Sequence, residues 1–369
     1  MERERILEAA GHFDMEGEIA EYCPFGSGHI NDTYRLTYRT PQGERRSILQ
    51  RMNRQVFQKP EELMENLMGV TSWLKKKIRE QGGDPQRETI NLVMGRDGKP
   101  YWVDASGDYW RMSLSIEHAF CYDQVEREED FYESAVAFGN FQRLLADYPA
   151  HTLHETIPDF HNTVDRFHKL QRAIQADPLG RAAGVQKEIS FALEREELAH
   201  VLCDQQERGE LPLRVTHNDT KLNNVMIDEK TGRGICVIDL DTVMPGLAVN
   251  DFGDSIRFGA STAAEDERDL SKVSCDLRLY EVYVKGFIEG CGGALTDREM
   301  EMLPMGAILM TYECGIRFLT DYLEGDHYFK ISREGQNLDR CRTQFCLVKD
   351  MEEKLPRMQS IVEQYRKTV

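Results

Sequence analysis

The sequence has no apolar run that approaches the roughly 20 residues needed to cross a bilayer, and its charged first 20 residues lack the apolar core of a secretion signal. Its nine cysteines form no C-x-x-C pair, which argues against a zinc ribbon or a disulfide framework. Positive charge is scarce, because 46 Lys and Arg stand against 64 Asp and Glu, a formal net charge of −18. We therefore expect a cytoplasmic protein with reduced thiols, no membrane anchor and no nucleic-acid partner.

The chain is long enough for two lobes, with 369 residues of which 40% are apolar. Strand-like patterns and turns dominate the first third, and the predicted elements there are a helix over 1–13, an antiparallel meander up to residue 51, a helix from Pro60, and strands near 90–94, 100–103 and 110–118. Helical spacing dominates later, over 131–148, 161–175, 185–204, 265–289, 298–323 and 335–365, with short strands in 213–260. This pattern predicts an α+β protein, with a small antiparallel-sheet lobe (residues 1–117, one main helix), a large mainly helical lobe (residues 118–369), and a ligand pocket between them.

The strongest chemical signal is VTHNDTKLNNVMID, residues 215–228. Asp219 is followed by Lys221 and Asn224 at a spacing typical of the catalytic loop of kinases. Phosphoryl transfer from ATP needs a carboxylate that orients or deprotonates the attacking hydroxyl, and an oxygen ligand for Mg²⁺ on the same loop. Asp219 fits the first role and Asn224 the second, while Lys221 can contact the transferred phosphate. His217 is interpreted as a scaffold residue that orders the loop.

A second signal is the apolar strand pattern GICVIDLDTV, which ends in Asp239, a carboxylate that can hold Mg²⁺. If the strand continues, the side chain of Asp241 lies on the same side as that of Asp239. Asp241 could then be either a second metal ligand or a structural hydrogen-bond acceptor, and the sequence leaves both roles open. The triplet Asp251–Gly253 reads DFG, which in protein kinases carries the metal ligand. Because Asp239 comes first here, we interpret Asp251 as a helix-start or loop-ordering residue, and Asp254 as structural.

A third signal is the glycine-rich turn PFGSGHIN between two predicted strands. Glycine lets the backbone approach phosphates closely, so this turn predicts nucleotide contacts at Gly26, Ser27, Gly28 and His29, with an ordinary hairpin turn as the alternative. The third strand has Gln50 where kinases usually carry lysine. This leaves open which group holds the α- and β-phosphates, leaves Glu65 without an obvious partner, and keeps a pseudokinase as a hypothesis from another class.

These motifs resemble the aminoglycoside phosphotransferase/choline kinase branch of the protein-kinase-like superfamily. The similarity is closest to those kinases of the branch that phosphorylate the anomeric hydroxyl of an N-acetylhexosamine, runs from about residue 12 to 365, and is most specific in DFGDSIRFGAST and ECGIRFLTDYLEGD. The resemblance implies a bilobal protein-kinase-like fold, ATP and Mg²⁺ as cofactors, a sugar 1-phosphate product, and no obligatory protein partner. These kinases also carry Gln at the lysine position, so inactivity does not follow.

The resemblance also implies roles for individual residues. Asp219 would be the base within reach of the sugar O1, and Asn224 and Asp239 would bind Mg²⁺. The backbone of the hinge Ile116–His118 would contact the adenine edge. Glu117, His118 and Gln50 are therefore further predicted nucleotide contacts. The sugar contacts would be Thr242, Arg317 and Tyr328.

Two alternatives remain from the residues themselves. Arg317 can equally pair with Glu313, one helical turn earlier, as an ordinary buried ion pair. The acceptor can also be a different small hydroxyl compound of the choline, homoserine or aminoglycoside type, whose cationic members favour carboxylates or aromatic cages.

Overall fold

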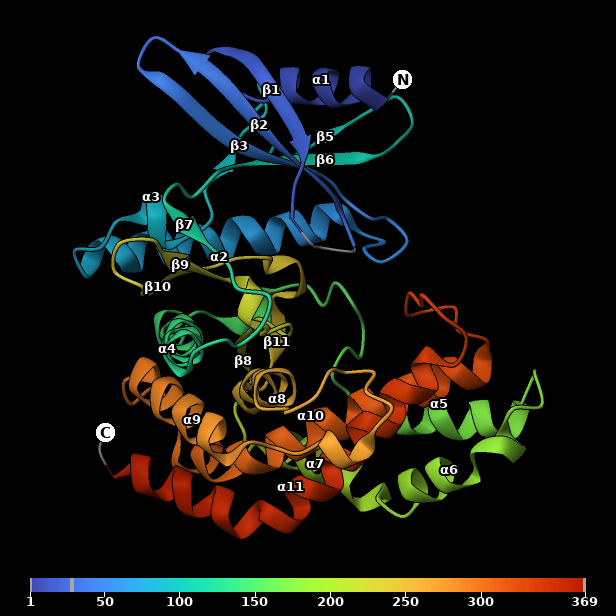
Figure 1. The fold of residues 1–369 in the computed structure, drawn as a ribbon. Coiled ribbons are helices and arrows are strands. Elements are labelled where there is room, and N and C mark those ends of the chain that lie inside the picture. The colour runs from blue at the N-terminus through green and yellow to red at the C-terminus, as the bar shows by residue number, and fades with distance from the viewer. Residues whose placement is uncertain (1, 27–29, 368–369) are drawn as a thin grey trace. The chain divides into compact units, whose positions relative to one another are not determined.

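The computed structural model describes residues 2–26 and 30–367 (Figure 1). The chain divides into two units, each made of segments that are distant in the sequence. The first unit consists of Met1–Phe120, Asp147–Pro158 and Met226–Met244, and the second of Cys121–Ala146, Asp159–Val225 and Pro245–Val369. Asp219 and Asn224 therefore belong to the second unit, whereas Asp239 and Thr242 belong to the first.

The first unit is built on an antiparallel sheet with the strand order β1-β2-β3-β6-β4, and β5 also pairs with β6. Its strands are β1 Glu18–Pro24, β2 Asp32–Thr40, β3 Gly43–Arg51, β4 Leu92–Val93, β5 Trp102–Val103 and β6 Tyr109–Leu114. The predicted meander is thus confirmed, but β6 ends at Leu114, short of the predicted end at His118.

Three helices belong to the same unit: α1 Glu2–His12, α2 Pro60–Glu80 and α3 Pro85–Glu88. The apolar side of α1, including Ile6, packs on the sheet residues Leu36, Leu49 and Trp110 to form its core. Pro60 begins α2, where a missing N–H costs nothing, as the sequence predicts. The helix predicted over 1–13 is thus confirmed as α1, and of these three helices α3 is the one that was not expected.

Two smaller sheets follow in the chain. β7 Ala119–Phe120, β9 Val225–Asp228 and β10 Gly234–Val237 form one sheet in the order β10-β9-β7. β8 Arg214–Thr216 and β11 Met244–Gly246 form a two-stranded sheet. β8, β9 and β10 are the short strands predicted in the block 213–260, whereas β7 lies outside that block and β11 was not predicted. The strands of the block flank the segments that carry Asp219 and Asp239.

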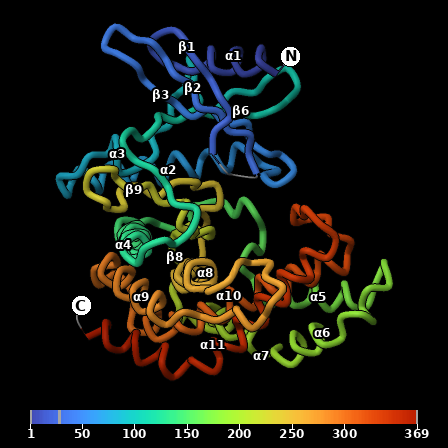
Figure 2. Tube along the Cα trace, in the orientation of Figure 1, coloured from blue at the N-terminus to red at the C-terminus, as the bar shows by residue number. Residues whose placement is uncertain are grey.

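The second unit is mainly helical, and its helices pack closely, α9 on α4 and α10 on α8, α5 and α11 (Figure 2). They are α4 Glu128–Leu144, α5 Thr163–Ala176, α6 Gln186–Leu193, α7 Glu196–Glu207, α8 Ala248–Gly259, α9 Leu277–Cys291, α10 Asp297–Glu324 and α11 Gln336–Arg366. Gly253 and Gly306 let the backbones of α8 and α10 touch, since a Cβ on Gly253 would lie 2.3 Å from the Gly306 carbonyl oxygen.

Two predicted helices are wrong in extent. The helix expected over 185–204 is broken into α6 and α7, and the burial of Ala192, Ala199 and Leu202 on both sides of the break explains why periodicity gave no stop signal. The helix expected over 265–289 begins only at Leu277, because Asp276 caps it by accepting from the N–H groups of Arg278 and Leu279. None of the described helices is both long and apolar enough to span a bilayer.

Candidate active site

The loop after β8 gathers three of the predicted site residues in one cluster of the second unit. Lys221 Nζ lies 2.7 Å from Oδ1 of Asp219. Asn224 Nδ2 donates to the Asp219 carbonyl oxygen at 2.8 Å and to its Oδ2 at 3.3 Å. The Asp219 side chain is 27% exposed, so its carboxylate remains open to an incoming hydroxyl group.

The electrostatics of this cluster keep Lys221 charged. Burial lowers the pKa of the Lys221 ammonium, but the Asp219 and Asp254 carboxylates together raise it by more, so the pKa lies above its usual value. A cation fixed at this place can neutralise part of the charge on a transferring phosphoryl group.

The loop is ordered from behind by Asp251, a fully buried residue of α8. Its carboxylate accepts hydrogen bonds from the backbone N–H groups of His217 and Asn218, at 2.9 and 2.8 Å, and from Gln142 Nε2 at 2.8 Å. The interpretation of Asp251 as a loop-ordering residue is therefore confirmed. Burial raises the pKa of this carboxyl, although its hydrogen bonds and the nearby His217 oppose the shift.

His217 has the scaffold position that the sequence predicts. The side chain is fully buried, and its Nδ1 accepts from the backbone N–H of Asp219 at 3.3 Å. Its ring meets Phe138 and Phe141 of α4 edge-on, with ring centres 5.4 and 6.1 Å apart. The His217 ring thus fixes the backbone at Asp219, whereas the Asp219 carboxylate remains partly exposed to solvent.

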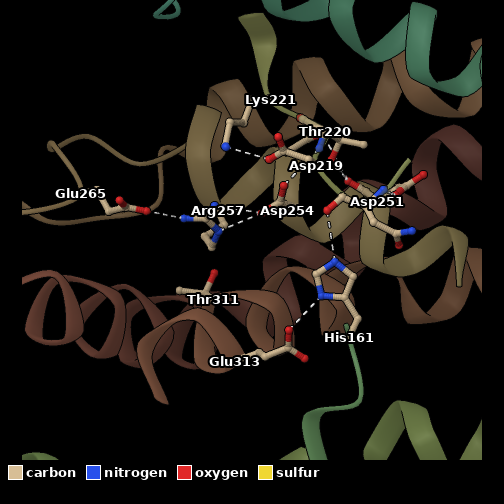
Figure 3. Close-up of polar contacts among 12 residues, drawn as sticks. His161, Asp219, Thr220, Lys221, Asp251, Asp254, Arg257, Glu265, Thr311 and Glu313 are labelled. Atoms are coloured by element: carbon tan, nitrogen blue, oxygen red, sulfur yellow. Dashed lines mark hydrogen bonds and ion pairs between the residues drawn. The ribbon is translucent and has the colours of Figure 1, made fainter. Parts of the chain in front are cut away.

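A second acid of α8 extends this support (Figure 3). Asp254 Oδ2 accepts from the Thr220 N–H at 3.1 Å, and its Oδ1 accepts from Arg257 Nε at 3.0 Å. Arg257 Nη1 in turn donates to Glu265 at 2.8 Å. Burial raises the pKa of Asp254, but Arg257 and Lys221 lower it by more, so the carboxylate stays ionised. The sequence reasoning missed Arg257; its spacing of three residues from Asp254 on a helix was the available signal.

A second cluster contains Arg317 and Tyr328, two of the predicted sugar contacts. The Arg317 guanidinium carbon lies 5.4 to 5.7 Å from the ring centres of Phe160, Tyr328 and Phe329, and its Nη2 lies 3.5 Å from the Tyr328 hydroxyl. Tyr328 is 63% exposed, so its ring offers a surface to a ligand. The geometry brings these two residues together as expected, whereas Thr242 lies in the other unit.

Arg317 does not pair with Glu313. The Glu313 carboxylate is occupied by His161 Nδ1 at 2.8 Å and by the Thr163 hydroxyl at 2.6 Å. Within residues 2–26 and 30–367, no carboxylate forms an ion pair with Arg317. The structure therefore does not contain the buried Arg317–Glu313 ion pair that the sequence offers as an alternative. His161 Nε2 also lies 3.3 Å from the Asn218 carbonyl oxygen, which links the Arg317 helix to the loop of Asp219.

Arg166 adds a second cation beside this cluster. Its Nε and Nη2 donate to the Phe160 carbonyl oxygen at 3.3 and 3.0 Å. Burial and the nearby Arg317 charge lower the pKa of Arg166 from its ordinary value, the direction expected for two guanidinium groups in one place. The sequence reasoning did not single out Arg166, and no motif marks it.

In the first unit, Gln50 is fully engaged by its neighbours. Its Oε1 accepts from Arg111 Nε at 3.0 Å, and its Nε2 donates to the Thr33 hydroxyl at 3.2 Å. Glu65, for which the sequence offers no partner, pairs with His154 Nε2 at 2.7 Å.

The segment around Asp239 differs from the prediction. β10 ends at Val237, so the strand does not run to Asp239, which instead has a left-handed backbone (φ 57°) and begins the short 3₁₀ turn Leu240–Thr242. The alternation argument for Asp241 therefore fails. Its carboxylate is bound by Arg111 at 2.5 Å and by Asn31 Nδ2 at 2.6 Å, which favours the structural acceptor.

The hinge is held by an arginine of α3. Arg87 Nη2 donates to the carbonyl oxygens of Glu117 and His118, at 2.9 and 3.4 Å, and pairs with Asp228 at 2.9 Å. The Glu117 side chain itself pairs with Arg46 at 2.9 Å. The nucleotide contacts predicted at Glu117 and His118 stay predictions.

In the glycine-rich turn, Gly26 has a φ of 82°, a conformation that favours glycine. Ser27, Gly28 and His29, also predicted to contact the nucleotide, lie outside the described residues.

The donor set of the predicted metal ligands suits Mg²⁺. Because Nδ2 of Asn224 is used by Asp219, its Oδ1 is the atom left for a cation, and Asp239 offers a carboxylate. The part of the chain that the structure describes holds no cluster of three or more His, Cys, Asp or Glu side chains that could hold a metal by itself. Asn224 lies in the second unit and Asp239 in the first, so their joint binding of Mg²⁺ stays a prediction.

Comparison with known proteins agrees with this chemistry. The family model described as the APH phosphotransferase enzyme family matches residues 104–275, which include Asp219, Asn224 and Asp239. The matched phosphotransferase segment also contains Asp251 and Asp254, the two acids that hold the Asp219 loop.

Solved structures show that the likeness in fold extends over the whole chain. An aminoglycoside phosphotransferase from Alicyclobacillus acidocaldarius is 11% identical with a TM-score of 0.62, covering 97% of this chain and 96% of that one. A choline kinase from Cryptosporidium parvum is 13% identical with a TM-score of 0.60, covering 98% of both chains. A spectinomycin phosphotransferase in complex with ADP and spectinomycin is 13% identical with a TM-score of 0.50, covering 99% and 98%. The chain thus has the predicted protein-kinase-like α+β fold.

Proposed function

We propose that this protein is a kinase that transfers the γ-phosphoryl group of ATP to the anomeric hydroxyl of an N-acetylhexosamine, N-acetylglucosamine or N-acetylgalactosamine, and releases the sugar 1-phosphate. One observation carries the proposal: the Asp219–Lys221–Asn224 cluster is linked through Asn218 and His161 to the helix that bears Arg317. The loop predicted to transfer the phosphoryl group and the cluster predicted to bind the acceptor thus belong to the same unit. The match of residues 104–275 to the phosphotransferase family supports the reaction type.

In this reaction Asp219 accepts the hydrogen bond of the sugar O1 hydroxyl and aligns the oxygen with the phosphorus. Proton acceptance can be modest, because an anomeric hydroxyl is more acidic than an ordinary alcohol. Lys221, held beside Asp219, balances the charge of the phosphoryl group as it moves. Asn224 and Asp239 would hold Mg²⁺, which neutralises charge on the nucleotide phosphates when bound.

The acceptor cluster favours a neutral sugar over a cationic acceptor. The rings of Phe160, Tyr328 and Phe329 are the type of aromatic cage that a quaternary ammonium requires, but the Arg317 guanidinium already occupies their centre. Arg166 adds a second positive charge nearby, which disfavours choline or an aminoglycoside by charge repulsion. Guanidinium groups donate readily to sugar oxygens and to an acetamido carbonyl.

The test is an acceptor panel of N-acetylglucosamine, N-acetylgalactosamine, galactose and choline, each with Mg·ATP, followed by ADP release and ³¹P NMR of the product. We expect turnover with an N-acetylhexosamine and a phosphorus signal coupled to the anomeric proton. Phosphorylcholine as the preferred product would overturn the sugar assignment and favour the cationic-acceptor class. Binding of Mg·ATP without turnover on any acceptor would favour the pseudokinase hypothesis. As the donor is ATP, we also propose the cytoplasm as the place of reaction.

A further inference from the structure

The first unit contains a buried ion pair next to the predicted metal ligand. Arg111 Nη1 of β6 lies 2.5 Å from Oδ1 of Asp241, and each residue is only 4% exposed. Asp241 belongs to the 3₁₀ turn Leu240–Thr242, which begins directly after Asp239. The pair therefore ties the turn that follows Asp239 to the central sheet.

The arginine is itself held in a fixed orientation. Arg111 and Gln50 are direct partners across β3 and β6, so their side chains share one face of the sheet. Gln50 Oε1 accepts from Arg111 Nε at 3.0 Å while its Nε2 donates to Thr33 at 3.2 Å. The residue at the position of the usual strand-three lysine thus orients a cation on the neighbouring strand.

Other contacts fix the same turn from both sides. Asn31 Nδ2 donates to Oδ2 of Asp241 at 2.6 Å, and its Oδ1 accepts from the Asn53 N–H at 2.9 Å. Asn66 of α2 donates to the Val243 carbonyl oxygen at 3.2 Å, just beyond the turn. Asp239, in a left-handed conformation that carries a backbone cost for a residue other than glycine, stands at the head of this anchored turn.

We propose that Arg111 and Asp241 are positioning residues: they fix the backbone at Asp239 so that its carboxylate is set for Mg·ATP. The inference rests on the proposed kinase function and extends it to residues that bind neither substrate. Asp241 is then not a second metal ligand, because its two oxygens are taken by Arg111 and Asn31 and it is almost wholly buried. Buried ion pairs contribute little net stability, so the distinctive contribution of this one is geometric.

The decisive variant is the double replacement Arg111→Met with Asp241→Leu, which removes both charges and roughly keeps the side-chain volume. Thermal unfolding and titration of ATP by calorimetry, with and without Mg²⁺, are measured on the full chain. We expect a folded protein whose Mg²⁺-dependent gain in ATP affinity falls by about 10- to 100-fold, the range for lost support of metal ligands, while Mg²⁺-free ATP affinity is unchanged. An unchanged Mg²⁺ dependence in the folded double variant would overturn the proposal.

Arg5→Met is the matched control, on helix α1, which packs on the same sheet. It breaks the pair of Arg5 with Asp104, a buried acid that lies outside the Asp239 segment, and should leave the Mg²⁺ dependence of ATP binding intact. The same loss in Arg5→Met would show a general effect of lost charge in the first unit and refute a specific role of Arg111.

Gln50→Leu is the second test, and it decides the matter if the double variant fails to fold. This substitution keeps both charges but removes the hydrogen bond that orients Arg111, so the Mg²⁺ dependence should weaken by a smaller factor. No change in Gln50→Leu, with a double variant that does not fold, would count against positioning. Because the binding readout needs no acceptor, it stays informative even if no sugar is phosphorylated, which separates this inference from the proposed function.

Discussion

Lys221 Nζ and Asp219 Oδ1 face each other at 2.7 Å, so the predicted catalytic carboxylate is ion-paired before any substrate arrives. An incoming hydroxyl would therefore meet an acid whose charge is already partly balanced. Such a carboxylate is better suited to orienting a proton than to removing it outright. Orienting a proton would be sufficient for the acidic anomeric hydroxyl of the proposed acceptor, in a reaction in which positioning contributes most of the rate.

Asp219→Asn tests this arrangement directly. The amide keeps the shape of the side chain but loses the charge that holds Lys221 and accepts the hydroxyl proton. We expect kcat to fall by roughly 10²- to 10⁴-fold, the usual range for a general base, while ATP affinity measured by calorimetry stays near that of the parent protein. Asp204→Asn on α7, a half-exposed acid outside the site, is the control. Full activity of Asp219→Asn would refute the assignment of the base.

Because Asp251 supports the loop, its replacement should lower the stability of the fold considerably. Asp251→Ala leaves the His217 and Asn218 N–H groups and the Gln142 amide without their buried acceptor. At about 1–3 kcal/mol for each buried unsatisfied group, the free energy of unfolding should fall by about 3 kcal/mol or more in urea titrations. Asp276→Ala, which removes only the N-cap of α9, should cost about 1 kcal/mol. Similar losses in the two variants would contradict the role given to Asp251.

The sequence was sufficient to predict those parts of the fold and of the site whose residues lie close together in the chain. Asp219, Lys221 and Asn224 lie within six consecutive residues, so their cluster follows from one loop. The meander and the helix that begins at Pro60 follow from turn chemistry and apolar periodicity. Asp251 was recognisable as structural because a better-placed acid precedes it.

What escaped prediction depends on residues that are far apart in the chain. Arg111 meets Asp241 across 130 positions, and His161 meets Glu313 across 152, and no periodicity encodes such pairs. The end of β10 at Val237 was missed because Ile238 and Leu240 continue the apolar alternation, whereas the backbone turns left-handed at Asp239. The alternative pairing of Arg317 with Glu313 fails for the same reason, since the Glu313 carboxylate is bound by His161 and Thr163, which are distant in the sequence.

Asp104 predicts how the first unit responds to acid. Burial raises the pKa of this carboxyl, but hydrogen bonds from Arg5, Trp110 and two backbone N–H groups outweigh it and lower the pKa from 3.8 to about 2. A carboxyl with a depressed pKa stabilises the fold above its ordinary pKa, and this contribution is lost as the pH falls through about 2. Thermal unfolding between pH 5 and 2 should therefore show a fall in stability that is shallower in Asp104→Asn. Parallel curves for the two proteins would contradict it.

If Arg317 and Tyr328 bind the acceptor as proposed, this geometry predicts that they contribute unequally to its binding. Arg317→Met removes the guanidinium that lies beside the rings of Phe160, Tyr328 and Phe329, together with its donors to the acceptor. We expect the KM for the N-acetylhexosamine to rise by about 10-fold or more, as for a lost charged hydrogen bond, while the KM for ATP stays constant. Tyr328→Phe loses only a 3.5 Å contact and keeps its ring, so the KM should change by less than about 3-fold. If Arg317→Met raised both KM values equally, or if it improved choline binding no more than Tyr328→Phe does, the ring cluster would not be the acceptor site.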